Sequence, residues 1–327
     1  MHYRLLPRAV WPLAVVLIAV AITSSSSLAN HGPGTSGGGS STASGETLKP
    51  GQFDLSLRVD YTKFENISRT GAERIALRSG EFDALDDATI TTVGISYGLV
   101  EDIQISAAIG YYWGQNFVDA ESEDGIDAES ATADPEGLTD LNLSVKWRIV
   151  KGAPGNIALI GGVIAPTGRD DVRLSNGELL EPSSQPGTGA WAFQAGIAYS
   201  RFLTSRVTND ASGIYTFRTE HDGFEVGDRA DLGVAFAYRL TESIRSFPNC
   251  SVFIETNAIW LGKDESDAEG KNPNSGGWTV YLTPGGRVRF NEHLALTVAP
   301  SIPILQELNG EQIESEFKLS ATLSYSF

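Results

Sequence analysis

The chain has 327 residues, a formal net charge of −17 and one cysteine, Cys250. A single cysteine excludes an intramolecular disulfide and CxxC motifs for metal or redox chemistry. With only four histidines in an acidic chain, candidates for acid–base or metal chemistry are few, and we expect neither a cofactor nor a nucleic acid partner.

The first residues have the pattern of an export signal. Two arginines precede an apolar stretch from Ala9 to Ile22, and Ser27-Leu28-Ala29 offers a small-x-small cleavage site. A membrane anchor is the alternative, but fourteen apolar residues are too few to cross a hydrocarbon core of ~30 Å. We therefore predict a signal peptide at residues 1–29.

Residues 30–51 follow, with glycine, serine and threonine in the majority and no apolar periodicity. Such a composition predicts a flexible N-terminal arm, because it cannot bury apolar surface by itself.

From Phe53 onward, apolar residues recur at every second position. FDLSLRVDYTKF places Phe53, Leu55 and Leu57 on one face and polar residues on the other. Segments of this length match the ~9–11 residues that a tilted membrane strand needs, and they exceed the usual strand of a soluble protein. Twelve segments follow or approximate the pattern: 53–64, 92–100, 103–114, 141–149, 157–167, 191–200, 207–219, 229–240, 251–261, 278–290, 294–305 and 316–327.

The connections alternate between short and long. The six long ones hold 29 of the 41 acidic residues and only 7 basic residues. Short periplasmic turns with long extracellular loops are typical of outer-membrane barrels. We therefore predict an all-β fold, a transmembrane antiparallel β-barrel of about 12 strands over residues 52–327, with no helix of useful length.

A soluble β-sandwich or lipocalin-like barrel is the rival architecture, because its strands also alternate between apolar and polar residues. The strands are too long and too many for one sandwich. Tyrosine and tryptophan lie near strand ends on the apolar face, as in interfacial girdles. The membrane barrel is therefore favoured, with outer-membrane lipid and lipopolysaccharide as partners and the bacterial outer membrane as the location.

The chain ends within a strand, at LSYSF. Barrel closure explains this ending, since a last strand paired with the first leaves no open edge. The alternating residues Leu323, Tyr325 and Phe327 resemble the assembly signal that the barrel-assembly machinery reads. That machinery is therefore an expected partner.

Charged residues also occupy the polar faces of the strands and should point into the lumen, because a lysine or arginine facing lipid near the midplane would cost ~2–4 kcal/mol. They indicate either a polar, slightly cationic pore lining or a closed lumen filled by salt bridges, and both interpretations stay open for a barrel of this size. The expected lumen-lining residues are Arg58, Asp60, Lys146, Arg148, Arg229, Asp231, Arg239, Glu255, Arg287, Arg289 and Lys318.

The stretch GPGTSGGGSSTASGETLKPGQFDLSLRVDYTKFE resembles the start of a family of Gram-negative outer-membrane "transporter" proteins named for a meta-pathway of phenol degradation. The resemblance is strongest over residues 32–65. It implies a barrel for small molecules and brings no catalytic motif.

The function that these features predict is an outer-membrane channel passing small solutes, with hydrophobic or aromatic compounds as candidates, without energy input. The alternative is a structural or adhesive barrel with a closed lumen. An outer-membrane hydrolase is a weaker alternative, because His221 and His293 lie in a loop and a turn rather than beside a serine on a strand.

The arm adds a hypothesis about the lumen. Residues 30–51 precede the first strand and are narrow, so they could fold into the barrel and restrict it. Any order there must come from hydrogen bonds to lumen side chains. Expected donors to the arm backbone are Arg58, Arg229, Arg287 and Arg289, with Glu46 of the arm as a counter-charge.

Overall fold

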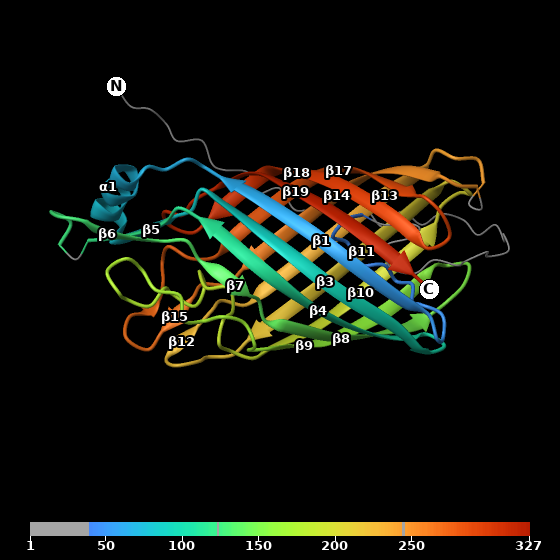
Figure 1. Ribbon diagram of the computed structural model, residues 1–327, viewed down its shortest axis with the longest axis horizontal. Coiled ribbons are helices and arrows are strands. Elements are labelled where there is room, and N and C mark those ends of the chain that lie inside the picture. Colours follow the sequence, from blue (N-terminus) through green and yellow to red (C-terminus); the bar gives the residue numbers. More distant parts are fainter. Residues whose placement is uncertain (1–38, 123, 244–245) are drawn as a thin grey trace, which may run out of the picture.

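The computed structural model describes residues 39–122, 124–243 and 246–327. The predicted signal peptide and residues 30–38 of the predicted arm lie outside these ranges. The main sheet has 13 strands in the order β3-β1-β19-β18-β17-β14-β13-β11-β10-β9-β8-β4-β7, and an additional pairing of β3 with β4 closes it into a barrel. Figure 1 shows the strands crossing the barrel obliquely.

Twelve long antiparallel strands make the barrel wall, and the three-residue strand β7 (Glu136–Leu138) adds to the edge of β4. The twelve are β1 (Phe53–Phe64), β3 (Asp87–Val100), β4 (Ile103–Gln115), β8 (Leu141–Val150), β9 (Asn156–Ala165), β10 (Ala192–Phe202), β11 (Val207–Arg218), β13 (Arg229–Arg239), β14 (Asn249–Leu261), β17 (Gly277–Arg289), β18 (Leu294–Leu308) and β19 (Ser315–Ser326). The prediction of an all-β, twelve-stranded antiparallel barrel is confirmed.

The alternation of side chains sets which face of each strand points outward. Along β1, Leu55 and Leu57 are 41% and 45% exposed, whereas Asp54 is 6% exposed. The outer surface is therefore apolar and the interior is lined by polar groups, the reverse of a soluble barrel. Small buried side chains such as Ala158, Ala198 and Ala235 fill parts of the interior.

Closure of the barrel joins the first strand to the last. Leu55 pairs with Tyr325 and Asp54 with Ser326. The backbones of Phe53 and Phe327 exchange two hydrogen bonds of 2.8 and 2.9 Å, and their rings stack with centroids 5.4 Å apart. The last strand is thus paired along its length. The role of Leu323, Tyr325 and Phe327 as an assembly signal stays a prediction.

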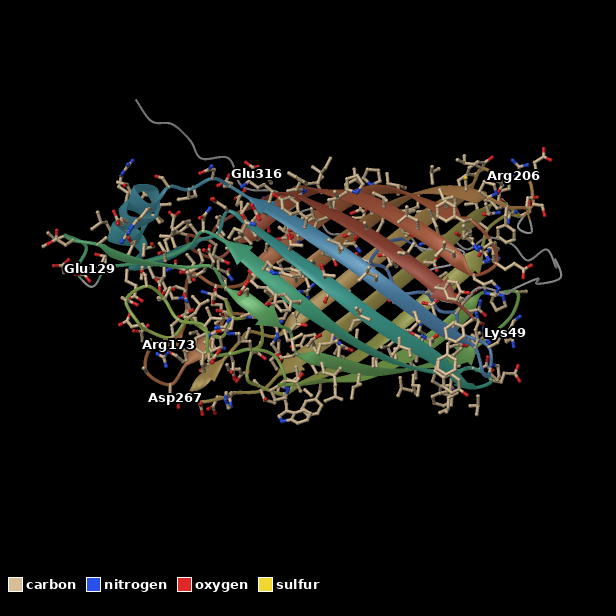
Figure 2. All side chains as sticks on the ribbon, in the orientation of Figure 1. Lys49, Glu129, Arg173, Arg206, Asp267 and Glu316 are labelled. Atoms are coloured by element: carbon tan, nitrogen blue, oxygen red, sulfur yellow. The ribbon has the colours of Figure 1, made fainter. Side chains whose placement is uncertain are left out.

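The two ends of the barrel differ. At one end, connections of two to nine residues join β3 to β4, β8 to β9, β10 to β11, β13 to β14 and β17 to β18. At the other end, the connections between barrel strands have ten to 26 residues, except for the six between β18 and β19. Figure 2 shows Glu129, Arg173 and Asp267 at the long-loop end and Arg206 and Lys49 at the short-turn end.

The long connections hold structure that the sequence did not reveal. Helix α1 (Arg69–Ser79) occurs in the first of them, so the expectation of no useful helix was wrong. Its N-cap, Ser68, accepts a hydrogen bond from the backbone N–H of Gly71, and only Ala72 and Ala76 are buried. Two alanines make too narrow an apolar stripe to give a helical signal in sequence. No helix among the described residues is long and apolar enough to cross a membrane.

Short strands complete the long-loop end. The strands β2 (Glu81–Ala84), β5 (Phe117–Glu121) and β6 (Glu129–Ala133) form one sheet, and β12 (Phe224–Glu225), β15 (Glu265–Ser266) and β16 (Gly270–Lys271) form another. Helix α1 packs on the first sheet through Phe82, Ala84, Val118 and Ala120. The long loops are therefore organised into a layer with a small core of its own.

The apolar outer surface of the barrel predicts how stability responds when a charged residue is placed on it. Val234 lies midway along β13 and is 45% exposed on the outer surface. Val234→Arg should lower the free energy of unfolding by about 2–4 kcal/mol, because it places a cation in hydrocarbon. Urea titration of the barrel in lipid bilayers measures this change. Val234→Ala is the control and should cost much less, and an equal cost would mean that this face does not contact lipid.

Candidate functional site

The interior of the barrel holds a segment of the chain itself. Residues 39–49, called here the arm segment, make hydrogen bonds to the polar faces of eight barrel strands. Because these strands surround the segment on opposite sides, it lies inside the barrel. The wall partners are Arg58 of β1, Gln104 of β4, Lys146 of β8, Asn156 of β9, Ser200 of β10, Ser212 of β11, Glu255 of β14 and Arg287 of β17.

Glu255 is the main anchor of the arm segment. Its carboxylate, 1% exposed, accepts hydrogen bonds from the backbone N–H groups of Ser40, Ser41 and Thr42 and from the hydroxyl of Thr42. Asn257, two residues along β14, donates from its side-chain amide at 3.1 Å. Successive N–H groups that converge on one carboxylate form a small anion-binding concavity, and here the anion belongs to the wall.

Two arginines bond the carbonyl groups of the same stretch of backbone. Arg58 donates to the carbonyl of Ser40 at 2.7 Å, and Arg287, 4% exposed, donates to the carbonyl of Gly39 at 3.1 Å. These two are among the four arginines that the sequence suggested as donors. The other two have different partners. Arg229 makes a two-point pair with Asp231, and Arg289 lies 5.4 Å from the ring centroid of Phe247.

The second half of the arm segment is held by neutral groups and one lysine. Lys146 donates to the carbonyls of Ser44 and Glu46, at 3.1 Å each. Ser200 accepts from the N–H of Gly45 at 2.7 Å. Leu48 is the one large apolar side chain of the segment and is 2% exposed.

Glycine is required where the arm touches the wall. A Cβ atom on Gly39 would lie 2.2 Å from the carboxyl carbon of Glu255, and one on Gly98 of β3 would lie 1.9 Å from the carbonyl oxygen of Lys49. Real Cβ atoms do not approach other atoms so closely. The glycines of the arm therefore allow close backbone approach as well as flexibility.

Several predicted lumen residues have partners in the barrel wall rather than in the arm segment. Arg148 pairs with Asp102 near the short turn between β3 and β4. Arg239 donates to the carbonyls of Ser205 and Thr241 at the same end. Lys318 lies 4.3 Å above the ring of Tyr281, and Asp60 pairs with Arg58 at 2.6 Å.

Four neutral anchors are not distinguished by the sequence pattern: Gln104, Asn156, Ser200 and Ser212. All four occupy inward positions of the two-residue alternation. Their place in that alternation is the sequence feature that indicates a side chain pointing into the lumen. They were passed over because serine and amide side chains are common in any barrel interior.

A second cavity lies between the barrel end and the long-loop layer. This vestibule has a volume of about 390 Å³. Arg218 and Arg229 line it from the ends of their strands, and seven carboxylates surround it. The carboxylates are Glu81, Asp83, Asp119, Glu121, Glu181, Asp264 and Glu311.

Four of these seven carboxylates lie on one face of the β2–β5–β6 sheet. Asp83 lies directly opposite Asp119, and Glu81 lies opposite Glu121, while the other face packs under α1. Like charges in facing positions destabilise a strand pair. Burial raises the pKa of Asp119 from 3.8 to about 6, with further contributions from Glu121 and Glu81. Burial, followed by the charge of Asp119, raises the pKa of Asp83 well above its usual range.

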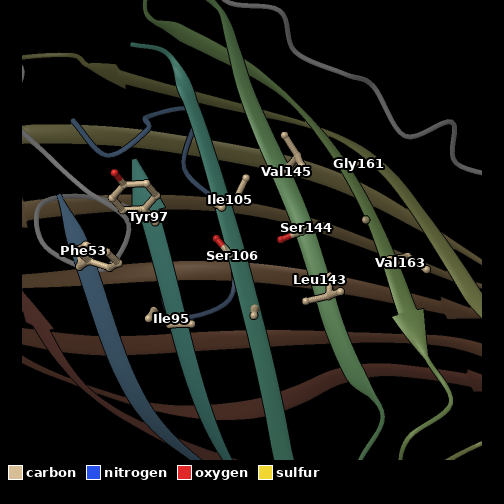
Figure 3. A pocket seen from close by; sticks show the side chains of 12 residues that line it. Phe53, Ile95, Tyr97, Ile105, Ser106, Leu143, Ser144, Val145, Gly161 and Val163 are labelled. Carbon is tan, nitrogen blue, oxygen red and sulfur yellow. The ribbon is translucent and has the colours of Figure 1, made fainter. Parts of the chain in front are cut away.

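Another cavity lies on the outside of the barrel. It has a volume of about 690 Å³ and spans β3, β4, β8 and β9. Figure 3 shows Ile95, Ile105, Leu143 and Val145 around it, with Gly161 contributing no side chain. Most of its lining residues belong to the outward face, so it is a groove in the outer surface of the wall.

No group of three or more histidine, cysteine or acidic side chains among the described residues is arranged to hold a metal ion. His221 lies 3.5 Å from the carboxylate of its chain neighbour Asp222 in a long connection, and His293 bonds the carbonyl of Ser326 at the short-turn end.

A closed barrel with an apolar exterior and a polar interior defines the class: an outer-membrane β-barrel of a Gram-negative bacterium. Residues 31–300 match the sequence family described as "Putative MetA-pathway of phenol degradation", and the chain belongs to that family. This agrees with the resemblance noted in residues 32–65.

Solved structures of outer-membrane channels are similar to this chain. An outer-membrane channel from Pseudomonas putida F1 is 15% identical, with a TM-score of 0.57, and the alignment covers 89% of this chain and 99% of that one. The CymD monoaromatic hydrocarbon channel is 11% identical, with a TM-score of 0.43 over 85% of this chain and 88% of that one. A search of curated proteins found no match.

Removal of the Glu255 charge should loosen the arm segment. Glu255→Gln replaces charge-assisted hydrogen bonds worth about 1.5–3 kcal/mol each by weaker ones. A thiol reagent should then label Ser41→Cys, in a Cys250→Ser background, about 10- to 100-fold faster. Asp231→Asn is the matched control, since it neutralises an inward carboxylate that pairs with Arg229 rather than with the arm segment. Equal labelling in both variants would show that Glu255 is no anchor.

The facing carboxylates predict a pH dependence for the long-loop layer. A carboxyl group whose pKa is higher in the folded state stabilises that state below its unfolded pKa and loses this effect as pH rises through the folded pKa. For Asp119 the window is from 3.8 to about 6. The local free energy of opening at β2 and β5 should therefore be higher at pH 5 than at pH 8, by on the order of 1–3 kcal/mol. Hydrogen exchange, corrected for intrinsic rates, measures it. Asp119→Asn should reduce the difference, and an unchanged difference would contradict the assignment.

Proposed function

We propose that this protein is a passive channel for small solutes across the outer membrane, with the arm segment as a removable restriction of its lumen. The observation that carries the proposal is the way in which the interior is filled. The segment is held almost entirely by hydrogen bonds to backbone groups, and water can replace such bonds when the segment leaves.

A barrel filled permanently by its own wall would be built differently. Small barrels close their interiors with interdigitating side chains from opposite strands. Here a length of backbone takes that place, and the charges that face it are of both signs: Glu255, Arg58, Lys146 and Arg287. Departure of the arm would leave a polar passage with cations and carboxylates on its walls.

The vestibule supports a route through the long-loop end, which we take to be extracellular. Its carboxylates would attract cations and repel anions near the entrance, although salt screens such effects beyond ~8 Å. Arg218 and Arg229 lie at the junction with the barrel. Carboxylates surround the entrance and arginines follow at the junction with the barrel, so the net charge of a solute alone would not determine whether it passes.

The competing function is a structural or adhesive barrel whose lumen stays closed. The extent of the arm's contacts favours it, since eight strands take part. A hydrolytic function has less support, because neither His221 nor His293 lies beside a serine nucleophile inside the barrel.

Deletion of residues 32–48 separates these functions. The deletion removes the Glu255 and Arg287 contacts with the arm, so single-channel conductance in planar bilayers should rise several-fold above that of the full chain. The shift in gel mobility between unboiled and boiled protein should persist, which shows that the barrel still folds.

Two outcomes would contradict the proposal. An equal conductance in the folded deletion and the full chain would mean that the arm is a spacer. Silence of both proteins would favour the closed structural barrel.

A further inference from the structure

The arm segment carries one acidic side chain, that of Glu46. Its carboxylate is 6% exposed and accepts a hydrogen bond from the side-chain amide of Asn156 at 3.2 Å. Glu46 takes part in none of the ion pairs found among residues 39–122, 124–243 and 246–327. An ionised Glu46 would therefore be a buried charge with no cation in contact, which is a costly arrangement.

Glu46 lies beside a row of three wall residues. Asn156, Ser200 and Asp210 are directly opposite one another across β9, β10 and β11. The hydroxyl of Ser200 donates to the carboxylate of Asp210, which is 2% exposed, and it accepts from the backbone N–H of Gly45. The docked arm therefore brings Glu46 within electrostatic reach of a second buried carboxylate.

The cations of this region are bonded to other groups. The ammonium of Lys146 on β8 donates to the backbone carbonyls of Ser44 and Glu46 rather than to a carboxylate. Arg148, on the same strand, pairs with Asp102. Both cations act on Glu46 only through space.

The balance of these effects favours the neutral form of Glu46. Burial is the largest cause and the charge of Asp210 is the next, whereas Arg148 and Lys146 act in the opposite direction. Gln104 of β4, which also bonds this part of the arm, is neutral. Glu46 belongs to the arm and to no strand of the wall, and its pKa is raised from 4.5 to about 7.

The fit of the arm leaves little room for water beside this side chain. A Cβ atom on Gly45 would lie 2.4 Å from the carbonyl oxygen of Asn156, and Leu48 is 2% exposed. Hydration of an ionised Glu46 therefore requires that this part of the arm move away from the wall. Once the arm is released, water can surround the carboxylate and the penalty for its charge disappears.

We propose that Glu46 makes the arm segment a pH-sensitive gate, in which the protonated side chain keeps the arm docked and its ionisation releases the arm. This inference rests on the proposed channel function and adds its regulation. The channel would be restricted in acidic medium and open in neutral or alkaline medium.

The direction follows from the linkage between proton binding and docking. A carboxyl group whose pKa is higher in the docked arm favours docking below its pKa in the released arm, and this effect is lost as pH rises through the docked value. With the ordinary pKa in the released arm, the window runs from 4.5 to about 7. Docking should weaken by about 100-fold across this window, because each pKa unit corresponds to a factor of ten.

Single-channel conductance in planar bilayers at pH 5 and pH 8 tests the gate. The conductance of the full chain should be several-fold higher at pH 8. Glu46→Gln keeps the size of the side chain and an acceptor for Asn156 but cannot ionise, so its conductance should stay low at both pH values. Deletion of residues 32–48 should give a high conductance at both.

Two further variants separate Glu46 from other carboxylates. Asp210→Asn keeps an acceptor for Ser200 but removes the neighbouring charge, so the rise between pH 5 and pH 8 should be smaller. Asp54→Asn is the matched control. Asp54 is also an inward carboxylate with 6% exposure at the short-turn end, but it accepts from Ser326 instead of the arm. Its variant should keep the full response, and the gel-mobility shift shows that each barrel folds.

A second readout follows the arm itself. Thiol labelling of Ser41→Cys, in a Cys250→Ser background, should be faster at pH 8 than at pH 5 after division by the rate of free cysteine at the same pH. With Glu46→Gln added, the corrected rates should be equal. This measurement distinguishes movement of the arm from an effect of pH on ions in the lumen.

The outcomes separate the gate from the channel. Equal conductance of the full chain at both pH values, beside a conducting deletion, would overturn the gate and leave the channel function in place. An undiminished pH response in Glu46→Gln would also overturn it, since another group would then be responsible. Silence of both the full chain and the deletion at both pH values would overturn the channel function itself.

Discussion

The constraint on which the structure depends is that hydrocarbon offers no partner to a backbone N–H or C=O group. A sheet in that solvent must close on itself, and here closure runs from the Phe53–Phe327 backbone pair through the β1–β19 ladder. The alternation of side chains then follows from the pleat. One residue in two faces lipid and is apolar, and the next faces inward. The interior of the barrel is consequently polar, and it has to satisfy those groups with something other than lipid.

The arm segment provides hydrogen-bond partners for these inward polar groups. Buried Glu255, Arg287 and Gln104 would each be costly to leave unpaired, and each is bonded to the backbone of residues 39–48. A peptide backbone is well suited to the task, since it presents donors and acceptors in alternation along a narrow rod. The same polarity makes the association reversible, because water supplies both kinds of group. Apolar packing of the same volume would hold the interior closed more permanently.

The sequence predicted the barrel well because a strict period of two over about twelve segments leaves few alternatives. Leu323, Tyr325 and Phe327 fell on the outer face as expected, and Arg58 and Arg287 were correctly suggested as donors to the arm. Helix α1 was missed, because it buries only two alanines. Arg229 was expected at the arm and is instead paired with Asp231, two residues away on the same face of β13. The partner of an inward charged residue depends on the register between strands that are far apart in the chain. The residue pattern of a single strand does not contain that register.

The contact between β17 and β18 shows how a local residue choice acts against the global constraint. Proline is rare within central strands because it removes a ladder donor, and it is tolerated mainly at edges. A closed barrel has no edge, yet Pro284 and Pro300 meet across one ladder, and the side-chain bond between Thr283 and Ser301 spans the gap. A serine–threonine bond contributes far less than two backbone bonds in a medium without water. The backbone ladder between β17 and β18 is thus interrupted beside the apolar patch of Phe253, whereas the β3–β4 ladder is continuous but for one bulge at Leu99.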